Sequence, residues 1–415
     1  MIYHPKHMVQ SISFLHVKEL LYLLGIILSA GMLSGYIAKI LKLPDVVFLL
    51  FAGIILGTNG LNLIDVKVNS TLNQLILIFG SCYILFDGGA SVRIHVIKKV
   101  WPTLLLISTL GVLITAFVAG VAAQFFIGLP FIVALLLGSV IASTDPATLI
   151  PVFKQTKVPA KIAQLVISES AFNDAMAAIL AMTLFSITIN ESALNLSLSF
   201  MGLLQQSIVG IIAGGILGYI SVSIISHDKY GFLREYAPLV TLMTVASAFL
   251  AADNFHASGF MAVFIFGIVL GNKDLFGFKT NNKEQEKLDD FILTTSLIMR
   301  IFIFILLGSQ VDFYLLNKYF WPAIGVVLIF MFIARPMTVF LCALPNKKAN
   351  WKLKELILMC WTRETGVIPG ALASMLVGLN APHADIIAAV TFMAIIITIT
   401  VQPLTTGWLV KKLKF

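Results

Sequence analysis

Long and nearly uninterrupted runs of apolar residues constrain the fold of this chain more than any other feature. About twenty consecutive apolar residues in a helix cross a bilayer, and many runs in these 415 residues approach or exceed that length. Only 12% of the residues are charged, against roughly 25% in an average soluble protein. The runs are continuous rather than alternating with polar residues, which excludes a transmembrane β-barrel. We therefore expect an all-α polytopic membrane protein.

Charged residues, prolines and polar clusters divide the chain into thirteen expected membrane spans. They cover residues 20–38, 46–63, 72–92, 101–126, 131–153, 160–189, 199–226, 236–253, 257–272, 289–311, 319–343, 353–378 and 383–410. An odd number of spans places the two termini on opposite sides of the membrane. No remaining segment is long enough for a soluble domain. We expect a single integral membrane transporter domain, residues 1–415, with no nucleotide-binding regulatory module after Phe415.

The distribution of basic residues tests this division, because cytoplasmic loops are enriched in lysine and arginine. Loops after odd-numbered spans, together with the C-terminal tail, hold 21 of the 28 basic residues; four lie on the other side and three lie inside spans. A missed or additional helix would scramble this asymmetry. It predicts a cytoplasmic C-terminus and an external N-terminus. It also explains the net charge of +8 without nucleic acid as a partner.

Seven ionisable residues lie well inside these spans, where a charge is unfavourable. They are Asp145, Glu169, Asp174, Arg300, Arg335, Arg363 and Glu364. At roughly 3 kcal/mol each, seven unpaired charges would cost on the order of 20 kcal/mol, more than the stability of a typical domain. They must therefore be paired, hydrated or functional, and an ion or proton pathway is the default function. Asp87, near the end of its span, is interpreted as a boundary residue.

The fifth span contains the sequence Ser143-Thr144-Asp145-Pro146. Proline lacks a backbone donor and disfavours helix at the preceding residue, so the helix should break near Thr144 and Asp145. In lipid, a broken helix is tolerated only where its freed backbone groups face protein or a cavity. The alternative is that Asp145 only caps the second half-helix.

The sixth span contains residues 168–175, Ser-Glu-Ser-Ala-Phe-Asn-Asp-Ala. Ser170 and Asp174 share one helix face, and Glu169 and Asn173 share the adjacent face. Carboxylate, hydroxyl and carbonyl oxygens are hard ligands suited to a small alkali cation, and no His or Cys cluster would suit a transition metal. The alternative is that the two acids only bond to neighbouring helices.

The twelfth span is also interrupted, by Gly366, Pro369 and Gly370. Spans five and twelve run in opposite directions, which is typical of inverted repeats with crossing discontinuous helices and a site at the midplane. Arg363 and Glu364 precede the interruption.

The arginines of spans ten and eleven are interpreted as possible partners of these acids. Arg335 can neutralise one buried carboxylate, and a pair with Glu169 would leave the two aspartates free to titrate. Arg300 either snorkels to the surface or pairs with an acid such as Glu364.

These segments together resemble the cation/proton antiporter superfamily, and specifically its NhaP-type sodium/proton exchanger branch. The resemblance covers nearly the whole chain. It rests on Leu43-Pro44-Asp45, on Thr144-Asp145-Pro146, on the run from Glu169 to Asp174, on an arginine in span eleven and on Trp361-x-Arg363.

The resemblance assigns roles to individual residues. It implies that Asp174 binds either the cation or the proton, and that Asp145, Ser170 and the backbone of Thr144 are further cation ligands. It also implies an ion pair between Glu169 and Arg335. Asn173 stands where other branches have a second aspartate. Arg363 is followed by Glu364, where the family often has glycine.

From these residues we expect a plasma-membrane antiporter that exports Na⁺, and also Li⁺, in exchange for H⁺ by alternating access. Competition of the two ions for one carboxylate couples their fluxes. Asn173 in place of a second carboxylate predicts electroneutral exchange of one cation for one proton. The resemblance implies a homodimer, whose scaffold stays fixed while spans five, six, eleven and twelve move. We expect neither enzymatic activity nor a cofactor.

Three other functions are compatible with parts of the pattern. Oxygen ligands do not fix the ion, so a K⁺/H⁺ exchanger is the nearest alternative. A passive cation channel would dissipate a proton gradient without a counter-cation. An intramembrane aspartyl protease could use Asp145 and Asp174, but the Gly-x-Gly-Asp arrangement of such enzymes is absent, as is the Gly-x-Ser-x-Gly turn of serine hydrolases.

Overall fold

The computed structural model describes residues 5–41, 43–98, 100–145, 149, 153, 156, 158–190, 196–226, 231–278 and 282–415. Within these ranges the chain is helical and contains no β-strand. Nine helical segments there are long and apolar enough to cross a membrane, and four further apolar helices are shorter. Each of the thirteen expected spans coincides with one of these segments. The predicted all-α polytopic fold is therefore confirmed.

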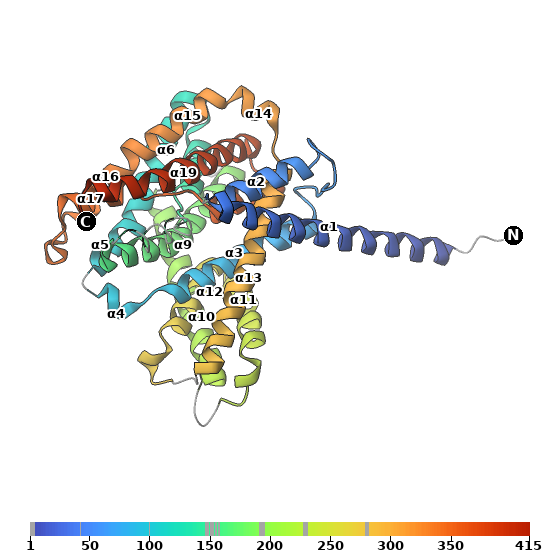
Figure 1. The fold of residues 1–415 in the computed structure, drawn as a ribbon, viewed down its shortest axis with the longest axis horizontal. Coiled ribbons are helices and arrows are strands. Elements are labelled where there is room, and N and C mark those ends of the chain that lie inside the picture. Colours follow the sequence, from blue (N-terminus) through green and yellow to red (C-terminus); the bar gives the residue numbers. More distant parts are fainter. Residues whose placement is uncertain are drawn as a thin grey trace.

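The helices follow one another with short connections (Figure 1). The first half comprises α1 (Pro5–Leu41), α2 (Asp45–Leu56), α3 (Thr71–Ser91), α4 (Ile94–Ile97), α5 (Trp101–Ser108), α6 (Leu110–Ile127), α7 (Phe131–Ile141), α9 (Ala160–Asn190) and α10 (Leu196–Ser226). The second half comprises η1 (Arg234–Tyr236), α11 (Ala237–Asn254), α12 (Gly259–Gly271), η2 (Lys273–Phe276), α13 (Asn282–Ser309), α14 (Phe313–Lys318), α15 (Phe320–Ile329), η3 (Phe330–Ala334), α16 (Arg335–Ala343), η4 (Lys347–Ala349), α17 (Leu353–Trp361), α18 (Val367–Gly378) and α19 (Ala384–Lys412).

The long helices pack into two groups (Figure 1). The first group, which we call the scaffold group, contains α1, α2, α3, α10, α11, α12 and α13. The second, which we call the crossing group, contains α5, α6, α7, α9 and α15 to α19. The two groups meet mainly where α3, α12 and α13 pack against α9 and α18, with smaller contacts of α10 with α9 and of α2 with α19. The interface between them is therefore formed by only a few helices.

Glycine allows the backbones of α3 and α12 to approach closely within the scaffold group. A Cβ atom at Gly267 would lie 2.2 Å from the Phe86 carbonyl oxygen, and one at Gly89 would lie 2.3 Å from the Phe264 carbonyl oxygen. Membrane helices have no hydrophobic driving force between them, and small residues at their contacts let the backbones approach closely enough to pack. The contact between α3 and α12 thus depends on these two glycines.

Both expected helix breaks are present in the described residues. Helix α7 ends at Ile141, and residues 143–145 are not helical. Pro146 and Pro151 lie outside the described residues. Residues 362–366 are likewise non-helical and separate α17 from α18.

Two details of the expected boundaries are wrong. Pro369 and Gly370 do not interrupt the twelfth span, because Pro369 occupies the first turn of α18, where its missing N–H has no intrahelical partner to lose. The second span ends at Leu56 rather than at residue 63. The chain turns back there, with the Leu61 N–H donating to the Ile55 carbonyl at 2.7 Å. A Cβ atom at Gly60 would lie 2.2 Å from that carbonyl oxygen, so the turn requires glycine.

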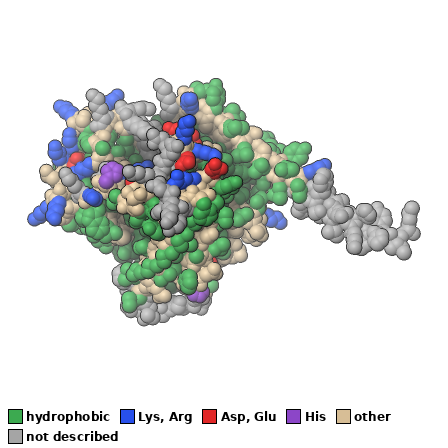
Figure 2. Space-filling view, turned by 90° about the horizontal axis from the view of Figure 1, so that it is seen from below, with side chains coloured by type: hydrophobic (Ala, Val, Ile, Leu, Met, Phe, Trp, Pro, Cys, Tyr) green, Lys and Arg blue, Asp and Glu red, His purple; other side chains and the backbone are tan. Residues whose placement is uncertain are grey.

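The surface separates apolar from basic side chains. Figure 2 shows large areas of hydrophobic side chains, as expected of a surface in contact with lipid. Lysine and arginine gather on the left of this view, on the side where Figure 1 places α17 and the C-terminus. The charge asymmetry of the sequence therefore has a counterpart in the folded molecule.

Candidate ion-binding site

The two non-helical segments cross each other in the interior of the crossing group. The Asp145 N–H donates a hydrogen bond of 2.8 Å to the Glu364 carbonyl oxygen. Gly366 lies directly against Asp145, because a Cβ atom there would be 2.0 Å from the Asp145 Cβ. The predicted pair of crossing discontinuous helices is thus present, and the backbones are in direct contact at the crossing.

We expect Gly366→Ala to disrupt the crossing. Its added methyl would overlap the Cβ of Asp145, which is fixed to the backbone and cannot rotate away. Overpacking of this kind destabilises a folded protein by about 1–3 kcal/mol, so a lower melting temperature in detergent and a loss of transport should both be measured. Gly407→Ala in α19 is the matched control, since a Cβ there meets nothing within 4 Å. Equal behaviour of the two variants would contradict the observed contact.

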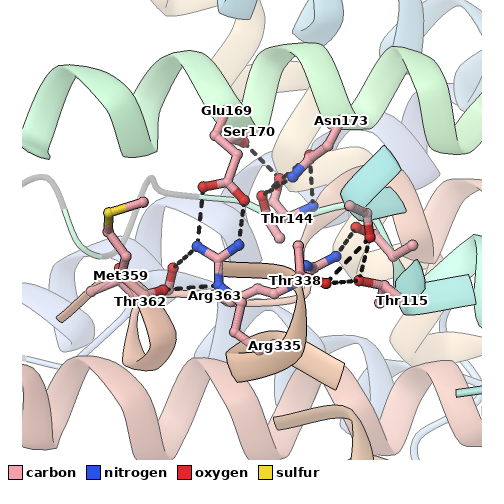
Figure 3. Close-up of polar contacts among 12 residues, drawn as sticks. Thr115, Thr144, Glu169, Ser170, Asn173, Arg335, Thr338, Met359, Thr362 and Arg363 are labelled. Carbon is pink, nitrogen blue, oxygen red and sulfur yellow. Dashed lines mark hydrogen bonds and ion pairs between the residues drawn. The ribbon is translucent and has the colours of Figure 1, made fainter. Parts of the chain in front are cut away.

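Helix α9 holds the first crossing segment through three polar side chains (Figure 3). The Asn173 amide donates to the Thr144 hydroxyl at 2.8 Å and accepts from the Thr144 N–H at 3.2 Å. The Ser170 hydroxyl donates to the Thr144 carbonyl at 2.7 Å. The Ser143 hydroxyl donates to the Asp174 carboxylate. Asn173 and Ser170 of α9 therefore bond the backbone N–H and carbonyl of Thr144, which the break leaves without helical partners.

A cavity of about 120 Å³ lies between the two helix groups and reaches this crossing. The crossing group lines it with Asp145, Ser170 and Asp174, and the scaffold group lines it with Asp87, Ser296 and Arg300, among others. Asp174 is 8% exposed and Ser170 is 4% exposed. The structure thus brings together the three side chains that the sequence singles out as cation ligands. Thr144 is not in the lining, and its carbonyl is bonded to Ser170.

The ion pair expected between Glu169 and Arg335 is present (Figure 3). Both guanidinium Nη atoms donate to the carboxylate, Nη1 to Oε1 and Nη2 to Oε2, the latter at 3.0 Å. The two side chains are 2% and 1% exposed. Arg335 also donates through Nε to the Met359 carbonyl at 2.8 Å and through Nη2 to the Thr362 carbonyl at 3.4 Å. It therefore joins α9 to the last turn of α17.

Arg335 directly follows a π-helical turn, η3. The Arg335 N–H bonds to the Phe330 carbonyl, five residues earlier. Single π turns inside α-helices occur frequently at functional sites. The turn here lies immediately before the arginine that faces α9.

Arg363 points from the second crossing segment to the first. Its Nη2 donates to the Ala142 carbonyl, and its guanidinium lies 5.2 Å from the centre of the Phe330 ring. The neighbouring Glu364 is 1% exposed, and its two carboxylate oxygens have no hydrogen-bond partner among the described residues. The pair suggested between Arg300 and Glu364 is therefore not formed. Arg300 instead lines the cavity beside Asp87.

Several residues of this region do not stand out in the sequence as site residues. Ser143 contacts the Asp174 carboxylate, although no role at the site is predicted for it from the sequence. Asp87 lies in the cavity lining rather than at a simple span boundary. An acidic residue followed by two glycines inside an apolar span is the sequence feature that could have indicated a role for Asp87. The helices that it faces, α9 and α18, are distant in the sequence. The arrangement offers two carboxylates and a hydroxyl to a small hard cation.

The site can be compared with those of known proteins. The family model for the transmembrane sodium/hydrogen exchanger matches residues 25–412. A probable Na⁺/H⁺ antiporter 2 of Methanocaldococcus jannaschii is 30% identical over 406 residues, with 91% of this chain and 93% of the relative covered. The K⁺/H⁺ antiporter NhaP of Alkalimonas amylolytica is 26% identical, with 93% of this chain and 64% of the relative covered.

Solved structures agree with this match. The structure of the sodium proton antiporter MjNhaP1 from Methanocaldococcus jannaschii superimposes with a TM-score of 0.81 at 29% identity, with 96% of this chain and 99% of that chain covered. The matched region includes α7, α9, α17 and α18. The chain therefore belongs to the transmembrane sodium/hydrogen exchanger family.

Proposed function

We propose that this chain is a secondary antiporter that exchanges Na⁺ for H⁺ across the cell membrane. The single observation that carries the proposal is that Asp145, Ser170 and Asp174 line one cavity at the crossing, between two helix groups. The names of the relatives from Methanocaldococcus jannaschii support Na⁺ and H⁺ as the exchanged ions.

In this proposal Asp174 is the carboxylate for which the cation and the proton compete. Asp145 and Ser170 provide further oxygen ligands, and the Thr144 carbonyl becomes available when Ser170 releases it. The displaced Ser143 hydroxyl is a second group that must rearrange, since it now donates to Asp174. When a cation binds, the hydrogen bonds of Ser143 and Ser170 are replaced by contacts with the ion. The polar groups therefore have partners both with and without the cation.

The remaining polar residues position these ligands. Asn173 holds Thr144 through its amide. The Glu169–Arg335 pair is fixed and neutral, so it takes no part in the exchange. Arg363 holds the two crossing segments together by its bond to the Ala142 carbonyl.

We further propose that one cation exchanges for one proton, that Li⁺ replaces Na⁺, and that the C-terminus is cytoplasmic with the N-terminus outside. The side chain of Asn173 is an amide and does not titrate, so Asp174 is the residue of the Asn-Asp pair that can exchange a proton. A homodimer formed through the scaffold group would leave the crossing group free to move against it.

A K⁺/H⁺ exchanger is the second candidate, because the matched relative from Alkalimonas amylolytica is named for that activity. The ligand atoms of the cavity are oxygens in either case, and both relatives align over nearly all of this chain. Ion preference is therefore the first quantity to measure.

The test uses purified protein in liposomes with an imposed pH gradient, to which Na⁺, Li⁺ and K⁺ are added in turn. We expect Na⁺ and Li⁺, but not K⁺, to dissipate the gradient, at a rate that an imposed membrane potential does not change. Dissipation by K⁺ alone would support the second candidate. Dissipation without any added cation would indicate a channel, and a rate that follows the potential would contradict one-to-one exchange.

A further inference from the structure

An apolar groove of about 390 Å³ lies on the outer side of the crossing group, away from the ion cavity. It is formed by η3 and α16 on one side, α17 on the second and the end of α19 on the third. Its lining includes Phe332, Pro336, Ile357, Trp361, Trp408 and Leu409. Phe332 is 55% exposed and Trp408 is 62% exposed, so the groove opens outward to the surroundings of the protein.

Basic residues gather at the ends of the two helices that wall this groove, at the start of α17 and at the end of α19, and we call them the lysine cluster: Lys352, Lys354, Lys411, Lys412 and Lys414. Two distant segments form it, since the Lys354 ammonium donates to the Lys414 carbonyl at 2.9 Å and lies 4.7 Å from the centre of the Phe415 ring. The one acid in residues 347–361, Glu355, is 8% exposed and occupied by Lys161 at 3.5 Å and by the Lys352 N–H at 2.9 Å. The cluster is therefore a net positive surface.

Trp408 connects the groove to the lysine cluster. Its ring lines the groove, and the Lys412 ammonium lies 4.7 Å from the centre of the same ring. Tryptophan and lysine at the end of a membrane helix mark the boundary between hydrocarbon and lipid headgroups. The groove therefore lies at the depth of acyl chains, and the lysines lie at the depth of phosphate groups.

We infer that this groove and its lysine cluster bind an anionic phospholipid, with an acyl chain against Trp361 and Trp408 and the headgroup on Lys411 and Lys412. Charge selects the lipid class, because basic residues next to a membrane attract headgroups with a net negative charge, whereas a zwitterionic headgroup has a net charge of zero. The apolar walls of the groove bury part of the acyl chain, and a lipid held only by charge attraction would not gain this buried apolar area.

The position of the groove couples this lipid to the crossing. Cys360 and Trp361 line the groove and are the last two residues of α17, immediately before the non-helical segment 362–366. Pro336, also in the lining, follows Arg335. The Trp361 indole donates to the Thr405 hydroxyl at 2.9 Å, which ties α17 to α19. A bound acyl chain would therefore contact the end of α17, next to the second crossing segment. If the chain exchanges ions as proposed above, the exchange should be faster with the lipid present.

The test measures lipid binding directly, so that it is independent of transport. Delipidated full-length protein is titrated with phosphatidylglycerol or phosphatidylcholine, and bound lipids are counted by native mass spectrometry. We expect phosphatidylglycerol to be retained, and Lys411→Gln/Lys412→Gln to weaken its binding about tenfold or more, since each lysine at a membrane surface contributes appreciably to anionic-lipid attraction.

Two variants separate the groove from general charge attraction. Lys283→Gln/Lys287→Gln removes two basic residues at the start of α13, far from the groove in sequence, and should leave binding unchanged. Leu409→Trp fills the groove without altering charge and should weaken binding as Lys411→Gln/Lys412→Gln does. Equal retention of the two lipids, equal weakening by both lysine variants, or unchanged binding to Leu409→Trp would each overturn the inference.

Discussion

Asp174→Asn is expected to reduce cation-driven proton exchange in liposomes to the level of protein-free vesicles while leaving the protein folded. Asparagine carries neither the negative charge that holds a cation nor a proton that can be released. Loss of a group next to a metal ligand typically lowers affinity about 10–100-fold, so loss of a ligand should exceed that range. The Ser143 hydroxyl that now donates to Asp174 can donate equally to an amide oxygen, so the fold should persist.

Asp253→Asn is the control for this variant. Asp253 is an exposed residue near the end of α11, in the scaffold group. The Asp253→Asn variant removes the same charge outside the cavity, and it should exchange ions like the unmodified protein. Measurable exchange by Asp174→Asn, or an equal loss in Asp253→Asn, would remove Asp174 from the proposed role.

Arg335→Met is expected to cause the largest loss of stability. The substitution would leave the Glu169 carboxylate buried at 2% exposure without its partner, and it would release the Met359 and Thr362 carbonyls. Removing one partner of a buried pair costs about 3–5 kcal/mol, because the other charge is left uncompensated. Thermal unfolding in detergent should show a marked decrease in the melting temperature.

The double variant Glu169→Gln/Arg335→Met tests the cause of that loss. If the uncompensated charge dominates, neutralising Glu169 should restore much of the stability, since neutral replacements of buried pairs are often tolerated. Glu169→Gln alone should resemble Arg335→Met in stability. A double variant as unstable as Arg335→Met would instead assign the effect to the lost carbonyl contacts at the end of α17.

The helical spans and both breaks follow from local sequence. A run of apolar residues long enough to cross a bilayer has few alternatives to a helix in lipid, which is why the expected spans coincide with the observed segments. The break before Pro146 follows from the backbone of one residue. Of the three residues expected to interrupt the twelfth span, Gly366 lies in the break at residues 362–366, whereas Pro369 and Gly370 lie within α18, because Pro369 is tolerated in a first helical turn.

The cavity could be predicted only in part. Asp145, Ser170 and Asp174 stand out because charged and polar side chains are unfavourable in spans. Asp87 and Arg300 reach the same region through the packing of the scaffold group against the crossing group, and Ser143 reaches Asp174 through the contact of the segment after α7 with α9. That packing depends on contacts between residues far apart in the sequence, such as Gly88 of α3 with Ala171 of α9, and no local pattern encodes it.

An arginine side chain from another segment bonds backbone carbonyls at the C-terminal end of each of the two helices that end at the crossing. Arg363 donates to the Ala142 carbonyl beyond α7, and Arg335 donates to the Met359 and Thr362 carbonyls at the end of α17. The C-terminal end of a helix carries a dipole charge equivalent to about half a negative electron charge. Part of the Arg363 charge is thus already balanced by α7. The guanidinium would therefore repel a cation at the proposed site of Asp145 and Asp174 less than its formal charge suggests.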